Sequence, residues 1–228
     1  MDFCRKQFRT LVAVAARAFV IWDKIFSLLI SLLMVVGFVW YCLCYTLPEE
    51  SELRQTVAAT AESYIGLKES DGSHERIIDR YNTLGVLPRG YEVTYSDSWC
   101  AVFGSVIAIE QNLTDIIPVE CSCEQQINLF SDAGRWIETD WYLPKVGDYI
   151  FYDWDYVTRK DSRGWSDHVG IVVKTVGPVI QVIEGNKDDA VAYRYLFIND
   201  PTIRGYGVPD YAGFLFSSQN PRLSRGLD

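Results

Sequence analysis

The chain has 228 residues, of which 49% are apolar, so its length and composition exclude a wholly disordered protein and allow one compact domain with appendages. Its formal net charge is −9, and five cations lie in the first 24 residues, so the rest of the chain is more acidic than the whole. An acidic body lacks the basic surface that neutralises phosphates, and we therefore expect no nucleic-acid partner.

An uncharged apolar run of 23 residues extends from Ile25 to Leu47. As a helix it would measure about 34 Å, which is enough to cross a hydrocarbon core of about 30 Å. Cations precede this run, and Glu49, Glu50 and Glu52 follow it. The positive-inside rule then predicts that residues 1–24 form a basic cytoplasmic segment and that the chain after residue 47 lies outside.

The run at 25–47 is predicted to be a transmembrane signal anchor, so the lipid bilayer is an expected partner of the protein. A cleaved signal peptide is the alternative, but its apolar region is shorter, about 7–15 residues, and ends in small residues. This run ends instead in Tyr-Cys-Leu-Cys-Tyr-Thr-Leu. Whether the anchor is cleaved stays open at this point.

The first half of the external chain has the pattern of helices. Apolar residues at helical spacing predict a helix at Leu53–Ile65, a short one around Ile77–Tyr81, and a third at about Trp99–Gln111. Ser122 and Gln125 have the spacing of a capping box, which predicts a fourth helix from Ser122 toward Ala133.

After Gly134 the apolar pattern changes to the two-residue period of strands. Four β-rich runs follow: Asp148–Asp153, His168–Lys174, Val179–Glu184 and Val191–Ile198. Gly177-Pro178 is a candidate hairpin turn, Phe214–Phe216 a candidate closing strand, and residues 217–228 a candidate flexible tail. Helices followed by strands predict an α+β domain at 48–216 with its helices packed on an antiparallel sheet.

The chain contains two histidines, and they differ in context. His74 lies in a polar segment at the start of a helix, where we expect it to face solvent. His168 begins a strand that we expect to be buried, a position from which an imidazole can reach a cleft. Glu184 and Asn186 end the strand that should pair with the His168 strand, so either can hold one ring nitrogen.

Cys100 lies in the first turn of the predicted third helix, with Asp97 as the expected N-cap. The positive end of a helix favours the thiolate, although burial alone would favour the neutral thiol. Cys121 and Cys123 are expected to be structural, because three external cysteines do not make a disulfide framework.

Four motifs together resemble the CHAP domain, the cysteine, histidine-dependent amidohydrolase/peptidase group of the papain-like superfamily. They are Asp97-Ser-Trp-Cys100, Pro144-Lys-Val-Gly-Asp148, Asp167-His-Val-Gly-Ile-Val172 and Val182-Ile-Glu-Gly-Asn186. The resemblance covers about residues 52–213. It implies a papain-like fold and a bacterial enzyme that cleaves amide bonds in peptidoglycan, as an N-acetylmuramoyl-L-alanine amidase or as a peptide endopeptidase.

The resemblance also implies roles for individual residues. Cys100 is the nucleophile and His168 the base, with Glu184 and Asn186 as the further polar residues of the site. Tyr95, Asp97, Trp99 and Trp165 are candidates for oxyanion stabilisation or substrate contact. The segment before Cys100 lacks the acidic, glycine-rich run that accompanies calcium in this family, so we expect no metal and no cofactor.

Two questions stay open on the sequence alone. The same fold without activity would be an envelope scaffold that binds cell-wall peptide from its tether. An active enzyme with this anchor would be suited to remodelling of the cell wall. It could equally belong to an envelope or secretion apparatus, and the proteins of that apparatus would then be its partners.

Overall fold

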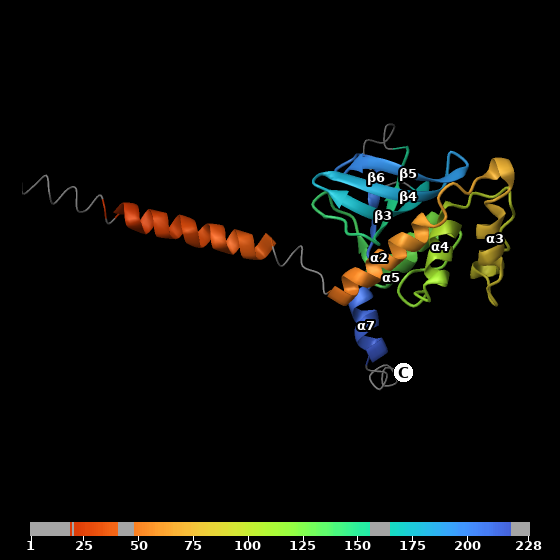
Figure 1. Cartoon of the computed structure of the whole chain (residues 1–228), viewed down its shortest axis with the longest axis horizontal. Coiled ribbons are helices and arrows are strands. Elements are labelled where there is room, and N and C mark those ends of the chain that lie inside the picture. The colour runs from red at the N-terminus through yellow and green to blue at the C-terminus, as the bar shows by residue number, and fades with distance from the viewer. Residues whose placement is uncertain (1–18, 20, 41–47, 156–164, 220–228) are drawn as a thin grey trace, which may run out of the picture. The chain divides into compact units, whose positions relative to one another are not determined.

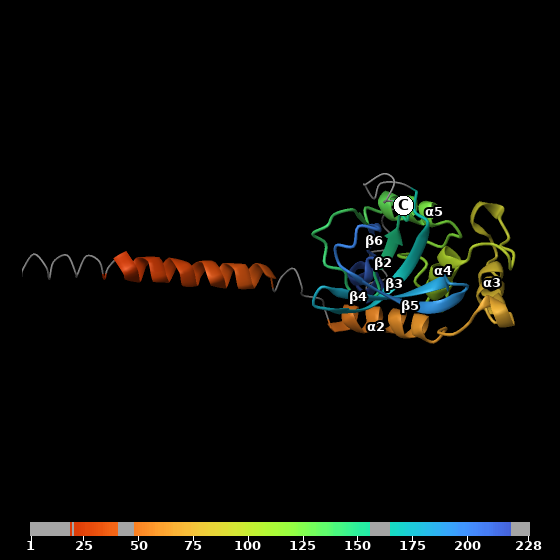
Figure 2. The same cartoon turned by 90° about the horizontal axis from the view of Figure 1, so that it is seen from above.

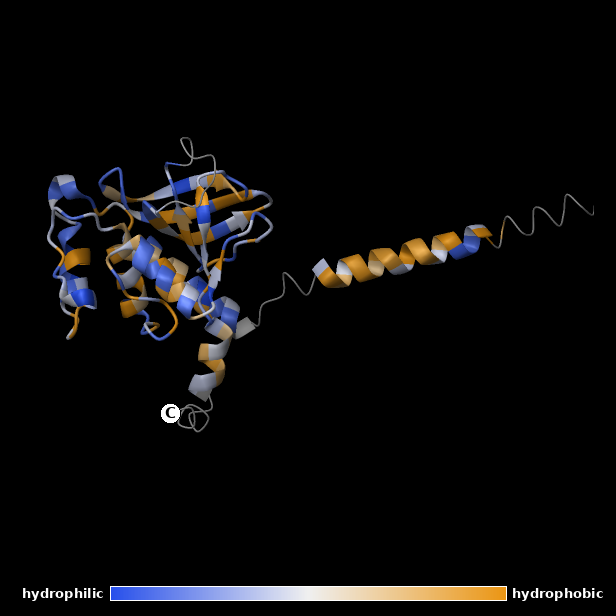
Figure 3. Ribbon diagram, turned by 180° about the vertical axis from the view of Figure 1, so that it is seen from behind, coloured by the Kyte–Doolittle hydropathy of each residue, from blue (hydrophilic) through white to orange (hydrophobic). Residues whose placement is uncertain are grey.

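A computed structural model describes residues 19, 21–40, 48–155 and 165–219 of the chain. The chain divides into two units, Met1–Thr46 and Leu47–Asp228. The first unit contains the apolar helix Ile21–Trp40, which is long and apolar enough to be a membrane span or a signal sequence. Figure 3 shows that most of this helix is hydrophobic, with a hydrophilic stretch near one end. The helix begins four residues before the predicted span, and the predicted residues 41–47 lie outside the described residues.

The second unit is an α+β domain, as predicted. Its helical segments are α2 (Pro48–Glu62), η1 (Glu69–Asp71), α3 (Glu75–Asn82), η2 (Pro88–Gly90), α4 (Cys100–Glu110), α5 (Cys123–Asp132) and α7 (Tyr211–Gln219). The four predicted helices correspond to α2, α3, α4 and α5. Ser122 is the N-cap of α5, and its side chain accepts a hydrogen bond from the Gln125 N–H, which confirms the predicted start of this helix.

The strands form one antiparallel sheet in the order β1-β6-β2-β3-β4-β5. They are β1 (Trp136–Ile137), β2 (Tyr149–Tyr152), β3 (His168–Val176), β4 (Val179–Lys187), β5 (Ala190–Phe197) and β6 (Ile203–Gly207). The four predicted strands correspond to β2 through β5. The hairpin at Gly177-Pro178 is also confirmed, with Gly177 at a φ of 57° between β3 and β4.

The expected closing strand at Phe214–Phe216 is wrong, because these residues lie in helix α7. Pro209 and Asp210 redirect the chain after β6, and the Phe214 N–H donates to the Asp210 carbonyl in a helical bond. The first residues of the expected tail, Ser217 to Gln219, also belong to α7. Residues 220–228 lie outside the described residues.

The larger of two apolar cores lies between the helices and one face of the sheet, as Figures 1 and 2 show for α2 and α4. Helix α4 is apolar on all sides, and every residue from Cys100 to Ile109 is buried. It packs against β3 and β4. Gly185 of β4 permits this close approach, because a Cβ atom there would lie 2.4 Å from the Phe103 Cβ. The first turn of α4 is therefore held against the middle of the sheet.

A buried ion pair fixes the start of the domain. Arg54 of α2 donates through Nη1 to the Asp148 carboxylate at 2.7 Å and through Nε to Glu50 at 2.8 Å. Asp148 also accepts bonds from the Tyr142 hydroxyl at 2.6 Å and the Lys145 N–H at 2.8 Å. These bonds compensate the burial of the carboxylate. Asp148 therefore joins α2 to the loop that leads into β2.

Candidate active site

Cys100 is the first residue of α4 and is 6% exposed. The expected N-cap at Asp97 is wrong, because Trp99 holds that position and makes no capping bond through its side chain. The Asp97 carboxylate instead closes the preceding turn, where it accepts bonds from the Thr94 N–H at 2.7 Å and the Tyr91 hydroxyl at 2.9 Å. The thiol nevertheless lies at the positive end of the helix, as expected.

His168 and Glu184 lie on the neighbouring strands β3 and β4. The register pairs Gly170 with Glu184, which brings the carboxylate to the start of β3. The His168 Nε2 lies 3.1 Å from the Glu184 Oε2, and the Cys100 thiol is the other side-chain partner of the ring. The second Glu184 oxygen accepts a bond from the Arg194 Nε at 2.6 Å. Glu184 is thus shared by one imidazole and one guanidinium.

The contacts between these groups favour their charged forms. Contact with Cys123 lowers the pKa of Cys100 most strongly; burial opposes this effect and His168 adds to it, leaving the pKa well below its usual range. Burial alone would lower the pKa of His168, but Cys100 and Glu184 raise it to about 9. Burial alone would raise the pKa of Glu184, but His168 and Arg194 hold it below its usual value. The site therefore favours a thiolate beside an imidazolium at neutral pH.

Cys123 is a site residue that the sequence did not reveal. It is the first residue of α5, it is buried, and its Sγ lies 3.6 Å from the Cys100 Sγ. The contact with Cys100, together with burial, raises the pKa of Cys123 well above its usual value, so this sulfur keeps its proton. Cys123 is therefore the thiol that donates to the Cys100 thiolate. Only the packing of the two helix starts reveals this contact, because 23 residues separate the two cysteines.

The other predicted site residues differ in where they lie. Asn186 has a φ of 56° and lines a pocket in front of His168, while Glu184 makes the contact with the ring. The Tyr95 hydroxyl donates to Asp79 at 2.7 Å. Trp99 is fully buried, and its indole N–H donates to Glu69 at 2.9 Å. Trp165 is 70% exposed.

The expectation that His74 faces solvent is wrong. His74 is 5% exposed and lies against the buried Trp99, with a ring centroid distance of 5.8 Å. Its Nε2 contacts the Tyr95 carbonyl at 3.1 Å. His74 therefore packs between the loop before α4 and the core, and His168 is the histidine that meets a cysteine.

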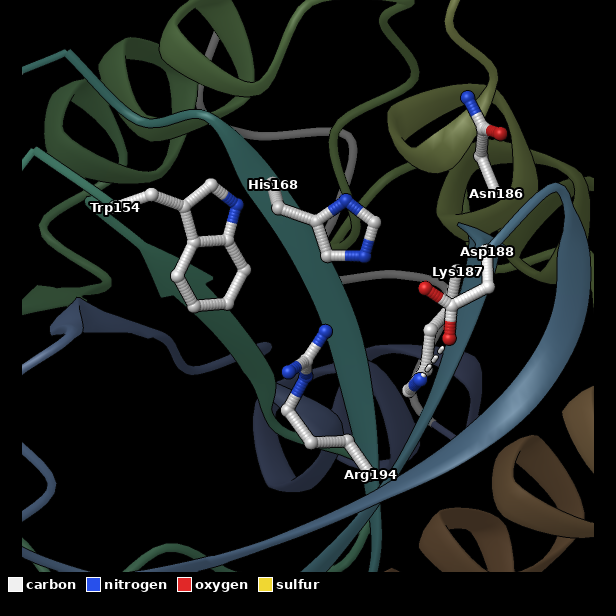
Figure 4. A pocket seen from close by; sticks show the side chains of 6 residues that line it. All are labelled: Trp154, His168, Asn186, Lys187, Asp188 and Arg194. Atoms are coloured by element: carbon white, nitrogen blue, oxygen red, sulfur yellow. Dashed lines mark hydrogen bonds and ion pairs between the residues drawn. The ribbon is translucent and has the colours of Figure 1, made fainter.

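A pocket of about 220 Å³ opens beside the His168 ring. Its other lining residues are Trp154, Asn186, Lys187, Asp188 and Arg194, shown in Figure 4. The Trp154 ring stacks on Tyr152 at a centroid distance of 4.8 Å, and the Arg194 guanidinium lies 4.9 Å from the Trp154 ring. Neither Trp154 nor Arg194 was among the predicted site residues.

In the described part of the chain, no group of three or more His, Cys, Asp or Glu side chains is placed to hold a metal ion. Comparisons of the chain with protein-family models, with curated proteins and with solved structures found no match. The chemistry of the site must therefore be argued from its own residues.

Proposed function

We propose that this chain is a bacterial cysteine amidohydrolase of the CHAP type, with a papain-like fold, that cleaves amide bonds in peptidoglycan. The observation that carries the proposal is the arrangement of Cys100 at the start of α4 with His168 beside it and Glu184 on the far ring nitrogen. A nucleophile, a base and a residue that orients the base are the three parts of a thiol hydrolase.

In the proposed mechanism the Cys100 thiolate attacks the amide carbonyl carbon, and the imidazolium of His168 donates its proton to the leaving amine. The carbon–nitrogen bond breaks and a thioester with Cys100 remains. The neutral His168 then takes a proton from water, which attacks the thioester and releases a carboxylic acid. The Cys100 backbone N–H, one of the unpaired donors at a helix start, stabilises the oxyanion.

Glu184 and Cys123 support this cycle from opposite sides. Glu184 fixes the ring orientation and stabilises its positive charge, and Arg194 holds the carboxylate in place at 2.6 Å. Cys123 stabilises the thiolate before attack through the 3.6 Å contact between the two sulfur atoms. A binding protein has no need of an activated thiol, so this arrangement favours the enzyme over the silent scaffold.

The helix Ile21–Trp40 fits an anchor that keeps the enzyme at the outer face of the cytoplasmic membrane, with a cytoplasmic N-terminus. An anchored enzyme acts on the wall near its membrane. This arrangement suits local remodelling, or a secretion apparatus that opens the wall at one point.

The test is digestion of purified peptidoglycan by the full-length protein in detergent. We expect soluble fragments from the parent protein and at least about a thousandfold slower release from Cys100→Ala, because a thiol nucleophile has no substitute in this site. A Cys121→Ser variant is the matched control and should digest normally. Equal digestion by Cys100→Ala and the parent would show that Cys100 is not the nucleophile.

A further inference from the structure

The pocket beside His168 adjoins the ring that protonates the leaving amine in the proposed mechanism. Its six lining residues include His168 but not Cys100. In the proposed mechanism His168 gives its proton to the amine, so the residue on the amine side of the bond occupies this pocket. The volume of about 220 Å³ is below the approximate 300–1,000 Å³ range of drug-sized sites and suits a single residue.

Arg194 is held in a fixed orientation at this pocket. Its Nε donates to Glu184 at 2.6 Å, and its guanidinium lies 4.9 Å from the Trp154 ring. Figure 4 shows the guanidinium directed toward the space between Trp154 and His168. Within the described part of the chain, Arg194 donates a hydrogen bond to Glu184 through its Nε atom alone. Both of its Nη atoms are therefore available to a ligand. Two adjacent N–H donors in one plane match the geometry of a carboxylate.

The charges around Arg194 also favour an anion. Its partner Glu184 is fully buried, whereas the Arg194 side chain is 30% exposed, so a ligand meets the cation and not the carboxylate. Two further charged side chains at the pocket, Lys187 and Asp188, pair with each other at 2.5 Å, and the Asp188 side chain is 86% exposed. Of the two basic side chains Arg194 and Lys187, Arg194 is the more exposed, at 30% against 20%.

We infer that the pocket binds a carboxylate on the amine-side residue of the substrate, beside the nitrogen of the scissile bond, and that Arg194 is its ligand. This inference rests on the proposed function and narrows it. The muramoyl–alanine bond has no free carboxylate there, because the carboxyl group of that alanine is itself in an amide bond. A cross-link to the amine of a diaminodicarboxylic acid has a free carboxylate beside that amine. The inference thus selects the endopeptidase.

The experiment compares two peptides with the full-length protein in detergent. Both are cross-linked through a diaminodicarboxylic acid on the amine side, and they differ only in whether the carboxyl group beside the scissile nitrogen is a free carboxylate or a carboxamide. We expect kcat/KM to be about 10-fold to 100-fold higher for the carboxylate, the range of a hydrogen bond to a charged group. Arg194→Gln should remove this preference, and Arg194→Lys should retain part of it.

The ratio of kcat/KM for the two peptides separates a binding role of Arg194 from a structural one. If Arg194→Gln merely displaced Glu184, both peptides would be cleaved more slowly by the same factor. Lys174→Gln, at an exposed position of β3 outside the pocket, removes the same charge and should keep the ratio. If Arg194→Gln does not fold, the ratio of kcat/KM for the two peptides in the parent protein still tests whether the pocket prefers a carboxylate. Equal cleavage of both peptides overturns the inference and leaves the proposed function standing.

The fragments released from whole peptidoglycan give an independent readout. New amines beside free carboxylates support the inference, and new N-terminal alanines from muramic acid overturn it. Intact peptidoglycan and intact peptides would overturn the proposed function itself, and the inference with it.

Discussion

Three features of the structure favour the thiolate form of Cys100. Its sulfur lies at a helix start, contacts the Cys123 thiol at 3.6 Å and lies beside His168, whose own charge is stabilised by Glu184. Each of these contacts favours the thiolate, and together they overcome burial. The type and position of Cys100, His168 and Glu184 were legible in the sequence. Their mutual contacts were not, because strand register and helix packing determine them.

The pH dependence of kcat/KM should report the charge on His168. In the proposed mechanism the imidazolium is the proton donor, so the rate should fall as pH rises through the pKa of about 9. Glu184→Gln removes the negative charge that raises this pKa, and the alkaline limb should move down by about one pH unit or more. Glu92→Gln, at an exposed position, is the control and should leave the profile unchanged. An alkaline limb that does not move in Glu184→Gln would show that Glu184 does not stabilise the imidazolium.

At the scale of elements, the site is the meeting point of two helix starts and one hairpin. The strands that carry it were predictable because β3 and β4 are long apolar runs joined at Gly177-Pro178. The edge elements were not: β1 has two residues, and β6 contains two glycines, so neither shows a two-residue period. The stretch that became α7 was assigned to a strand because its apolar run Phe214–Phe216 fits either structure.

The adjacent starts of α4 and α5 predict sensitivity to peroxide. The Cys100 thiolate attacks hydrogen peroxide to give a sulfenic acid and hydroxide, and the Cys123 thiol then forms a disulfide with release of water. Two thiols lose two hydrogens while one peroxide becomes two waters. The sulfur atoms, 3.6 Å apart, must approach to about 2.05 Å.

We expect peptide mapping to find the Cys100–Cys123 bond, with activity lost on oxidation and restored by dithiothreitol. In Cys123→Ser the loss should be irreversible, because no thiol is left to intercept the sulfenic acid before further oxidation. Cys121→Ser should behave like the parent protein. A peroxide-treated parent that has no Cys100–Cys123 bond and loses activity irreversibly would contradict this prediction.

At the scale of the molecule, the sequence separates an apolar N-terminal helix from an acidic α+β domain, and the structure describes both as distinct units. The domain contains its own core and its own candidate site, so the chemistry does not depend on the helix. The helix bears on where the proposed reaction would take place, and the charges on either side of it predict the orientation of the chain in the membrane. The proposed reaction itself depends on a thiolate at Cys100 beside an imidazolium at His168.

The rate of alkylation of each cysteine tests that ion pair most directly. Full-length protein in detergent is treated with iodoacetamide at pH values of about 5 to 9, and modification is followed by peptide mass spectrometry. We predict that Cys100 reacts faster than Cys121 and Cys123 at neutral pH, and that His168→Ala slows Cys100 at least about tenfold there. A Cys100 that reacts no faster than Cys121, with or without His168, would contradict the account.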